Sequence, residues 1–104
     1  MFIALYHWSV KDGSEQDFQD CWRVLTEEIY RDCGSLGSRL HRAEDGTWFA
    51  YAQWPDRAAY DAARNIPDTD EAARARFRDS IAESFPVTFM QVTDDLLQPR
   101  SATD

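Results

Sequence analysis

The sequence predicts an α+β domain, a four-stranded antiparallel sheet with its helices on one face. Runs of apolar residues with a period of two alternate with runs that have helical spacing, in the order β-α-β-β-α(α)-β. The pair Asp45-Gly46 also separates two strand-like runs, which is a strong hairpin signal. With 104 residues the chain is long enough for one domain. We expect that domain to occupy residues 1–97 and the polar residues 98–104 to form a disordered tail.

The N-terminal third is expected to form a strand and a long helix. The strand spans Phe2–Val10, where apolar residues fill one face and half of the other. Ser14 is the expected N-cap of the helix, with Asp17 three residues later in an approximate capping box. The helix should run to Cys33, and Gly34 lies where a left-handed cap is wanted. Its apolar stripe comprises Phe18, Cys21, Trp22, Leu25 and Ile29.

The strand that follows the hairpin is apolar on both faces. The hairpin turn itself should need φ > 0 at both Asp45 and Gly46. One face of the strand carries Trp48, Ala50, Ala52 and Trp54, and the other carries Phe49, Tyr51 and Gln53. A sheet with one face in water alternates apolar and polar residues instead. Both faces therefore need a cover. Because this chain supplies helices for only one face, we expect a second copy to cover the other in a homodimer.

The C-terminal half is expected to add two helices and the last strand. Pro55 precedes an alanine-rich helix that ends near Asn65, and Asp68 is the expected N-cap of the next helix. The inward stripe of that helix comprises Ala73, Phe77 and Ile81. Pro86 should break it ahead of a final strand over Val87–Val92. The complete order is the split βαβ arrangement of ferredoxin-like folds.

Charge and composition exclude several classes of function. The chain carries 19 acidic and 11 basic residues, a formal net charge of −8, which disfavours nucleic acid as a partner. No apolar segment approaches the roughly 20 residues of a membrane helix, so no membrane partner is expected. Cys21 and Cys33 would lie about 18 Å apart on one helix. We therefore expect reduced thiols and a cytoplasmic protein. No phosphate-binding glycine loop or nucleophile elbow is present.

Two segments carry a resemblance to a known family. The stretch Gly34–Leu40 before the second strand, the stretch Trp54–Tyr60 after the third, and the order of elements resemble the antibiotic biosynthesis monooxygenase (ABM) family of dimeric α+β barrels over residues 2–95. The resemblance implies a homodimer with a cavity between sheet and helices in each subunit. Some members oxidise aromatic polyketides with O2 and no cofactor, whereas others bind or degrade haem.

The haem-degrading branch of that family does not fit. Its members carry an Asn on the first strand, then a Trp and a His on the helical segment after the third strand. The Asn position is taken here by Tyr6, and no Trp or His occurs between Asp56 and Ser84. An iron ligand cannot be replaced by Ala or Phe. We therefore expect no haem degradation of this type and no cofactor.

Oxygenation without a cofactor needs a base, a dry apolar pocket and a donor for the developing oxyanion. The candidates to handle the proton are Tyr6 and His41, both on predicted strands. His7 is the other histidine. Because the first and second strands should flank the third, it would lie about 10 Å from His41, too far for a shared metal, and no metal site is expected. Both histidines could instead face solvent or a subunit interface.

Aromatic side chains indicate where a ligand pocket would be. Trp8 shares a strand face with Tyr6, Trp22 lies on the helix stripe above that sheet, and Tyr60 comes from a later helix. These rings would line an apolar cavity with a few polar groups, or would instead fill the core. Arg39 could anchor an anionic ligand, or could be an ordinary exposed arginine near carboxylates.

Two functions remain open at this point. The first is a cofactor-independent monooxygenase that acts on an aromatic, phenolic small molecule, with Trp8 and Trp22 stacking the substrate. The second is a non-catalytic dimeric module that binds a hydrophobic small molecule or serves a stress or regulatory role. An open pocket lined by Tyr6, Trp8 and Trp22 would favour the first function. A pocket filled by those rings would favour the second.

Overall fold

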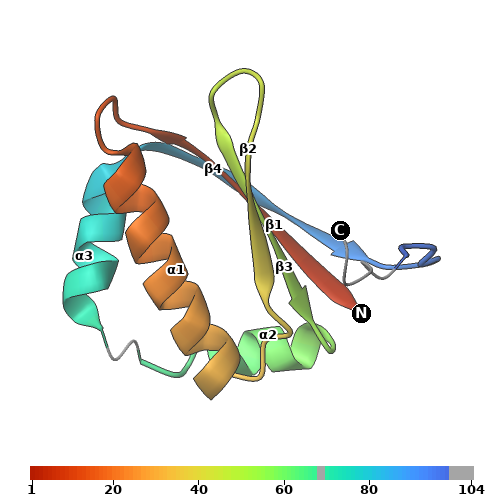
Figure 1. Cartoon of the computed structure of the whole chain (residues 1–104). Helices are drawn as coiled ribbons and strands as arrows, with labels where there is room; N and C mark the ends of the chain where they lie inside the picture. Colours follow the sequence, from red (N-terminus) through yellow and green to blue (C-terminus); the bar gives the residue numbers. More distant parts are fainter. Residues whose placement is uncertain (68–69, 99–104) are drawn as a thin grey trace.

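The structure is a computed structural model that describes residues 1–67 and 70–98, and it confirms the predicted α+β, ferredoxin-like fold (Figure 1). Within these residues, four antiparallel strands form one sheet in the order β2-β3-β1-β4, with the helices on one side of it (Figure 1). The elements in chain order are β1 (Phe2–Val10), α1 (Glu15–Asp32), β2 (Ser38–Arg42), β3 (Trp48–Trp54), α2 (Arg57–Ala63), α3 (Glu71–Ser80) and β4 (Ile81–Gln91). The predicted tail lies outside the described residues from position 99 onward.

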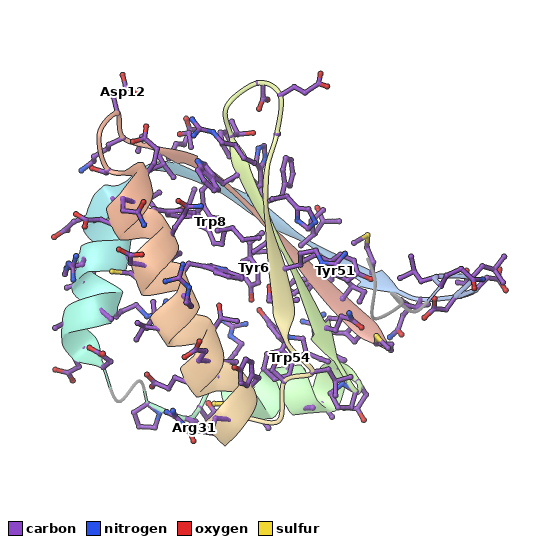
Figure 2. The ribbon with its side chains drawn as sticks, viewed as in Figure 1. Tyr6, Trp8, Asp12, Arg31, Tyr51 and Trp54 are labelled. Atoms are coloured by element: carbon purple, nitrogen blue, oxygen red, sulfur yellow. The ribbon has the colours of Figure 1, made fainter. Side chains whose placement is uncertain are left out.

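Strand register assigns each side chain of β3 to a face of the sheet. Ala50 pairs with Tyr6 of β1 on one side and with Leu40 of β2 on the other. Directly paired residues share a face, so the set Trp48, Ala50, Ala52 and Trp54 faces the helices, and each of the four is buried. Tyr51 points to the opposite side, whereas Tyr6 lies on the helix side (Figure 2).

The face opposite the helices carries apolar side chains among polar ones. No helix of the described chain lies over it (Figure 1). Its half-buried side chains include Leu5, Phe49, Tyr51 and Phe85. Met90 on the same face leaves 38% of its surface exposed. This is the face for which the sequence predicts a second copy of the chain, and the homodimer stays a prediction.

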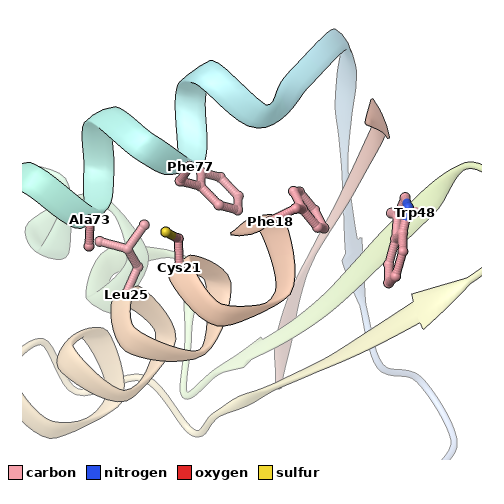
Figure 3. Packing of buried hydrophobic residues seen from close by; sticks show 6 residues of the cluster. All are labelled: Phe18, Cys21, Leu25, Trp48, Ala73 and Phe77. Carbon is pink, nitrogen blue, oxygen red and sulfur yellow. The ribbon is translucent and has the colours of Figure 1, made fainter. Parts of the chain in front are cut away.

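Two hydrophobic clusters hold the helices on the sheet. The first lies between α1, α3 and β3 and comprises Phe18, Cys21, Leu25, Trp48, Ala73 and Phe77 (Figure 3). The second lies beneath α2 and comprises Phe2, Ala4, Ala52, Trp54 and Tyr60. Aromatic contacts tighten both clusters, as in the stacked pair Phe18 and Phe77, with ring centroids 5.1 Å apart. The sheet face between the two clusters is where a cavity remains.

The hairpin turn differs from its prediction. Gly46 has φ 88°. Among the described residues only glycines have positive φ, so the φ of Asp45 is not positive. The Gly46 N–H donates to the Ala43 carbonyl and the Ala43 N–H donates to the Thr47 carbonyl. This is a three-residue loop built on a type I turn, which needs one left-handed residue instead of two. Asp45 accepts hydrogen bonds from the Thr47 N–H and Oγ1, and these lower the pKa of the Asp45 carboxyl.

Helix starts follow the predicted residue types but not always the predicted residues. Ser14 is the N-cap of α1, yet its side chain makes no capping bond, and Asp17 pairs with Arg76 of α3 instead of completing a capping box. The cap of α2 is Asp56, whose side chain accepts from the Ala59 N–H. The cap of α3 is Asp70, and the predicted cap, Asp68, lies outside the described residues.

The last strand is longer than predicted. Helix α3 ends at Ser80, so Ile81 belongs to β4, and Pro86 lies inside the strand. Between the pairs Leu5 with Thr88 and His7 with Phe85, the register shifts by one residue. Proline has no N–H to donate to a ladder, and strands tolerate it at an edge or a bulge. Strand β4 provides both, which is why Pro86 does not separate helix from strand here.

Candidate functional site

A cavity with two lobes lies between the sheet and the helices. The larger lobe has a volume of about 290 Å³, and its lining includes Tyr6, Glu28, Trp54, Tyr60, Arg64 and Arg74. The smaller lobe has a volume of about 110 Å³, and its lining includes Tyr6, Trp8, Trp22, Ala50, Ala52 and Phe77. The lobes adjoin, since Tyr6, Ile29, Trp54 and Arg74 line both.

Small residues on the central strands leave this space. Ala4 of β1 pairs with Ala52 of β3, and the neighbouring Ala50 pairs with Tyr6. An alanine contributes only a methyl group, whereas Trp48 and Trp54 at the ends of β3 fill their positions. Helix side chains therefore pack against the two ends of the sheet and leave its middle open. The spacing Trp-Ala-Ala-Trp on one strand face is a sequence signal for such a cavity.

The aromatic residues predicted for the site lie along this cavity. The Trp8 and Tyr6 rings are parallel, with centroids 5.6 Å apart. Trp8 also meets Phe18 and Phe77 edge to face, at 5.4 Å and 5.6 Å. Trp8 is therefore a core residue on one side and a wall of the smaller lobe on the other. Tyr60 lines only the larger lobe.

The Tyr6 hydroxyl is a proton donor at neutral pH. Burial raises its pKa most, and the nearby Tyr60 hydroxyl adds to the rise through its charge and a hydrogen bond. The guanidinium groups of Arg64 and Arg74 partly offset this by lowering the pKa. A phenol with a raised pKa keeps its proton at neutral pH, so the Tyr6 hydroxyl can donate a hydrogen bond into the cavity.

Two buried donors in the cavity wall have no partner among the described residues. They are the indole nitrogen Nε1 of Trp54 and the hydroxyl Oγ of Ser38. Trp54 is 4% exposed and lines both lobes, and Ser38 lines the smaller one. A buried polar group without a hydrogen bond costs about 1–3 kcal/mol. A ligand with an acceptor atom would remove that cost.

Glu28 adds a carboxylate to the larger lobe. It is only 7% exposed, although it belongs to a charged stretch of α1. The sequence reasoning missed it because glutamate is rarely buried. A signal was available, since positions 18, 21, 25 and 28 continue one helical stripe. Arg64 and Arg74 were missed as well, because their place in the lobe depends on how α2 and α3 pack. Trp54, at the end of β3, was expected only as part of an apolar strand face.

The histidines lie on the other face of the sheet. His7 and His41 both pair with Phe49, one from each neighbouring strand, as the predicted strand order requires. The His7 ring stacks on Phe49 with centroids 3.9 Å apart, and its Nε2 lies 2.9 Å from Thr47 Oγ1. His41 is exposed and lines neither lobe. Strand alternation thus separates His41 from Tyr6, the other residue predicted to handle the proton.

Residues 1–67 and 70–98 contain neither a metal-binding cluster nor a membrane-spanning helix. No three His, Cys, Asp or Glu side chains gather there to hold a metal ion. None of the helices in this part of the chain is long and apolar enough to span a membrane. Cys21 is buried and Cys33 is half-buried, and both thiols are free of disulfides.

Known proteins resemble this chain both in sequence and in fold. The model of the antibiotic biosynthesis monooxygenase family matches residues 1–83. No curated protein matches the chain. Among solved structures, the cofactor-independent oxygenase SnoaB from Streptomyces nogalater has a TM-score of 0.75 at 16% identity, covering 93% of this chain and 97% of that one. A putative antibiotic biosynthesis monooxygenase from Bordetella bronchiseptica has a TM-score of 0.75 at 20% identity, covering 88% and 96%.

A third solved structure, Rv0793 from Mycobacterium tuberculosis, has a TM-score of 0.73 at 14% identity and covers 92% of this chain and 98% of that one. At these identities the structural likeness establishes the fold. Any chemistry must therefore be inferred from the cavity between sheet and helices and from the residues that line it.

Proposed function

The chain belongs to the antibiotic biosynthesis monooxygenase family, and from this premise we propose that it oxygenates a phenolic aromatic molecule with O2 and without a cofactor. One observation carries the proposal. A single cavity joins aromatic walls to a buried carboxylate, two guanidinium groups and two proton donors, Tyr6 and Trp54. The SnoaB protein, which shares the fold, is a cofactor-independent oxygenase and gives the proposal its reaction class.

Substrate binding would use both lobes. The apolar rings would lie over Ala50 and Ala52 against Trp8 and Trp22, and the phenolic end would lie near Tyr6. Burial of each ring carbon contributes roughly 25 cal/mol for every Å² removed from water. The polar groups then select the orientation, since one end of the cavity holds the charged side chains and the other end is apolar.

The chemistry begins with a proton. The Glu28 carboxylate takes the phenolic or enolic proton, and the positive charges of Arg64 and Arg74 favour the resulting anion. The Tyr6 hydroxyl and the Trp54 N–H donate hydrogen bonds to the oxyanion. His41 has no part in this step, because it lies across the sheet.

Oxygen then reacts with the bound anion. The anion gives one electron to O2, and the substrate radical and superoxide combine to form a carbon–oxygen bond. Protonation gives a hydroperoxide, which loses water to leave a quinone-type carbonyl. One oxygen atom enters the product and the other leaves as water, so the substrate supplies all four electrons that reduce O2. The apolar lobe keeps bulk water away from the radical pair.

One observation favours the second function, a non-catalytic module that binds a hydrophobic small molecule. The smaller lobe holds only about 110 Å³, because the Trp8 ring packs against Phe18 and Phe77 and occupies part of the space. Ligand pockets of drug-sized molecules have about 300–1,000 Å³. The larger lobe, at about 290 Å³, approaches that range and favours the oxygenase.

The working unit is part of the proposal. We propose a homodimer in which the uncovered sheet faces of two copies stack on each other, because large apolar patches are seldom left in water. We also propose a cytoplasmic location, where Cys21 and Cys33 stay reduced. The homodimer and the cytoplasmic location are both predicted from the sequence, and we keep them as proposals.

The test is oxygen uptake with a series of anthrone-type phenols in the presence of a metal chelator. Uptake above the buffer blank with release of the quinone is expected for the unmodified protein.

Glu28→Gln should lower kcat by about 100-fold or more with a small change in KM. Glu27→Gln, the exposed neighbour on α1, should keep the full rate. Absence of uptake with every phenol would reject the oxygenase. An unchanged kcat in Glu28→Gln would remove Glu28 from the role of base.

A further inference from the structure

A thiol lines the larger lobe at the end of helix α1. Cys33, the C-cap residue of α1, is half-buried and packs against the hydrophobic cluster that contains Trp54 and Tyr60. The other thiol, Cys21, is 2% exposed and lines neither lobe. We propose that Cys33 is a site of covalent modification, where its thiol adds to a quinone bound in the larger lobe. The proposal needs the lobe but no turnover, and so goes beyond the oxygenation proposed above.

An unsatisfied donor in the same lobe indicates a ligand with an acceptor atom. The Trp54 side chain is 4% exposed and lines the lobe, and its Nε1 has no hydrogen-bond partner among the described residues. The Trp54 ring meets the Tyr60 ring edge to face with centroids 5.6 Å apart, so packing holds the indole in place. An indole N–H can only donate, and the carbonyl oxygen of a quinone can accept. This observation is independent of the thiol and points to the same class of ligand.

The size and the lining of the lobe suit a small quinone. The volume of about 290 Å³ lies just below the range of about 300–1,000 Å³ that drug-sized ligands occupy, and so fits a molecule of one or two rings. Ile29 of α1 and Ala63 of α2 supply apolar wall for such rings. Arg64 and Arg74 bring positive charge to the same lining, which favours the anion that forms when a thiol adds to a quinone.

The addition is balanced without any further reactant. The thiolate is the nucleophile, and the Glu28 carboxylate in the same lining takes the thiol proton. The Cys33 sulfur then forms a bond to a ring carbon of the quinone, and the π electron pair of the ring C=C bond moves toward the carbonyl to give an enolate. That oxygen takes the proton back from Glu28, and a proton shifts from the ring carbon to the second carbonyl oxygen. The product is a hydroquinone thioether, formed with no oxidant, reductant or leaving group.

Incubation with 1,4-naphthoquinone under argon, followed by mass spectrometry, tests the proposal. The expected product carries one naphthoquinone per chain, on the peptide that contains Cys33, while Cys21 stays unmodified. The rate should level off as the quinone concentration rises, because binding in the lobe precedes the new bond. Cys33→Ser should abolish the adduct.

Two tryptophan variants test whether the lobe positions the quinone. Trp54→Phe removes the indole N–H but keeps a ring, and should slow the addition about tenfold or more. Trp48→Phe is the matched control, because its Nε1 is also buried without a partner in the described chain, yet Trp48 lines neither lobe. It should keep the wild-type rate. Reaction of Cys33 with 4,4′-dithiodipyridine, which has no carbonyl group, should be equally fast in both variants and the wild type.

Several results would overturn the proposal. These are the absence of an adduct, an adduct at a residue other than Cys33, a rate that rises in proportion to quinone without levelling off, or equal rates of addition in the two tryptophan variants. If Trp54→Phe does not fold, the position of the adduct and the concentration dependence of its rate still decide. Because the quinone is supplied directly, saturable addition at Cys33 without oxygen uptake from phenols would keep this site and reject the oxygenase. Oxygen uptake without the adduct would do the reverse.

Discussion

Tyr6 shows how one residue changes role when its surroundings are known. From the sequence it is a phenol on a strand, able to act as base or donor. In the structure, burial and the Tyr60 hydroxyl raise its pKa, which leaves it as a donor. The base that we propose is therefore another group, the Glu28 carboxylate in the same lobe. The sequence could predict that Tyr6 and Trp8 share a face, because strand alternation is regular. The unpartnered Trp54 N–H depends on packing details that no sequence pattern contains.

The raised pKa of Tyr6 predicts how stability depends on pH. The unfolded chain loses this proton near the ordinary pKa of about 10, whereas the folded protein holds it to higher pH. The stabilisation is therefore complete below about pH 10 and is lost as pH rises further, because the unfolded state then binds fewer protons. Urea unfolding at several alkaline pH values should show a steeper loss for the wild type than for Tyr6→Phe. Tyr30→Phe, at an exposed tyrosine of α1, should keep the wild-type slope. Parallel curves for the wild type and Tyr6→Phe would contradict this reading.

At the scale of elements, the spacing of apolar residues predicted the apolar faces of strands and helices well. It predicted less well where each element begins and ends. The bounds of β1 and the apolar stripe of α1 agree with the sequence, since both follow from repeated spacing. The end of α3 does not, because Pro86 was interpreted as a helix breaker. Its effect depends on whether a ladder needs its N–H, and on an edge strand with a bulge it does not. The turn at Gly46 likewise depends on loop length, which the pair Asp45-Gly46 leaves open.

Capping gives the prediction at this scale. The Asp70 carboxylate accepts from the Ala73 N–H at 2.9 Å, whereas Ser14 makes no such bond. Asp70→Ala should lower the free energy of unfolding by about 1 kcal/mol. Ser14→Ala should change it by less than about 0.5 kcal/mol. Urea unfolding of the two variants beside the wild type measures both values. Equal losses would show that the two caps do not differ as the hydrogen bonds indicate.

At the scale of the whole molecule, one sheet carries apolar side chains on both faces, and the described helices cover only one face. The covered face forms the core and the cavity. The other face carries Phe49, Tyr51 and Phe85, and the proposed stacking of two such faces would remove these side chains from water. The sequence could predict this division because β3 is apolar on both faces. It could not predict the cavity's charged end, which α2 and α3 assemble from distant segments.

Sedimentation velocity tests the proposed homodimer. The wild type should sediment at twice the chain mass of 12.0 kDa at micromolar concentration. Tyr51→Glu places a charge on the uncovered face and should give monomers, since an unpaired charge at an apolar interface is costly. Tyr30→Glu, the same change on the exposed side of α1, should leave the dimer intact. A wild-type protein that sediments only as a monomer would contradict the proposed stacking.

The most direct test of the central claim, that the cavity between sheet and helices is where a phenol is oxygenated, compares oxygen uptake by two variants of α2. Ala63 lines the larger lobe, and its neighbour Ala62 is exposed and lines neither lobe. Ala63→Phe puts a ring into the lobe and should lower kcat/KM by about tenfold or more, whereas Ala62→Phe should keep the wild-type value. Equal rates in the two variants, or no uptake by the wild type, would contradict the claim.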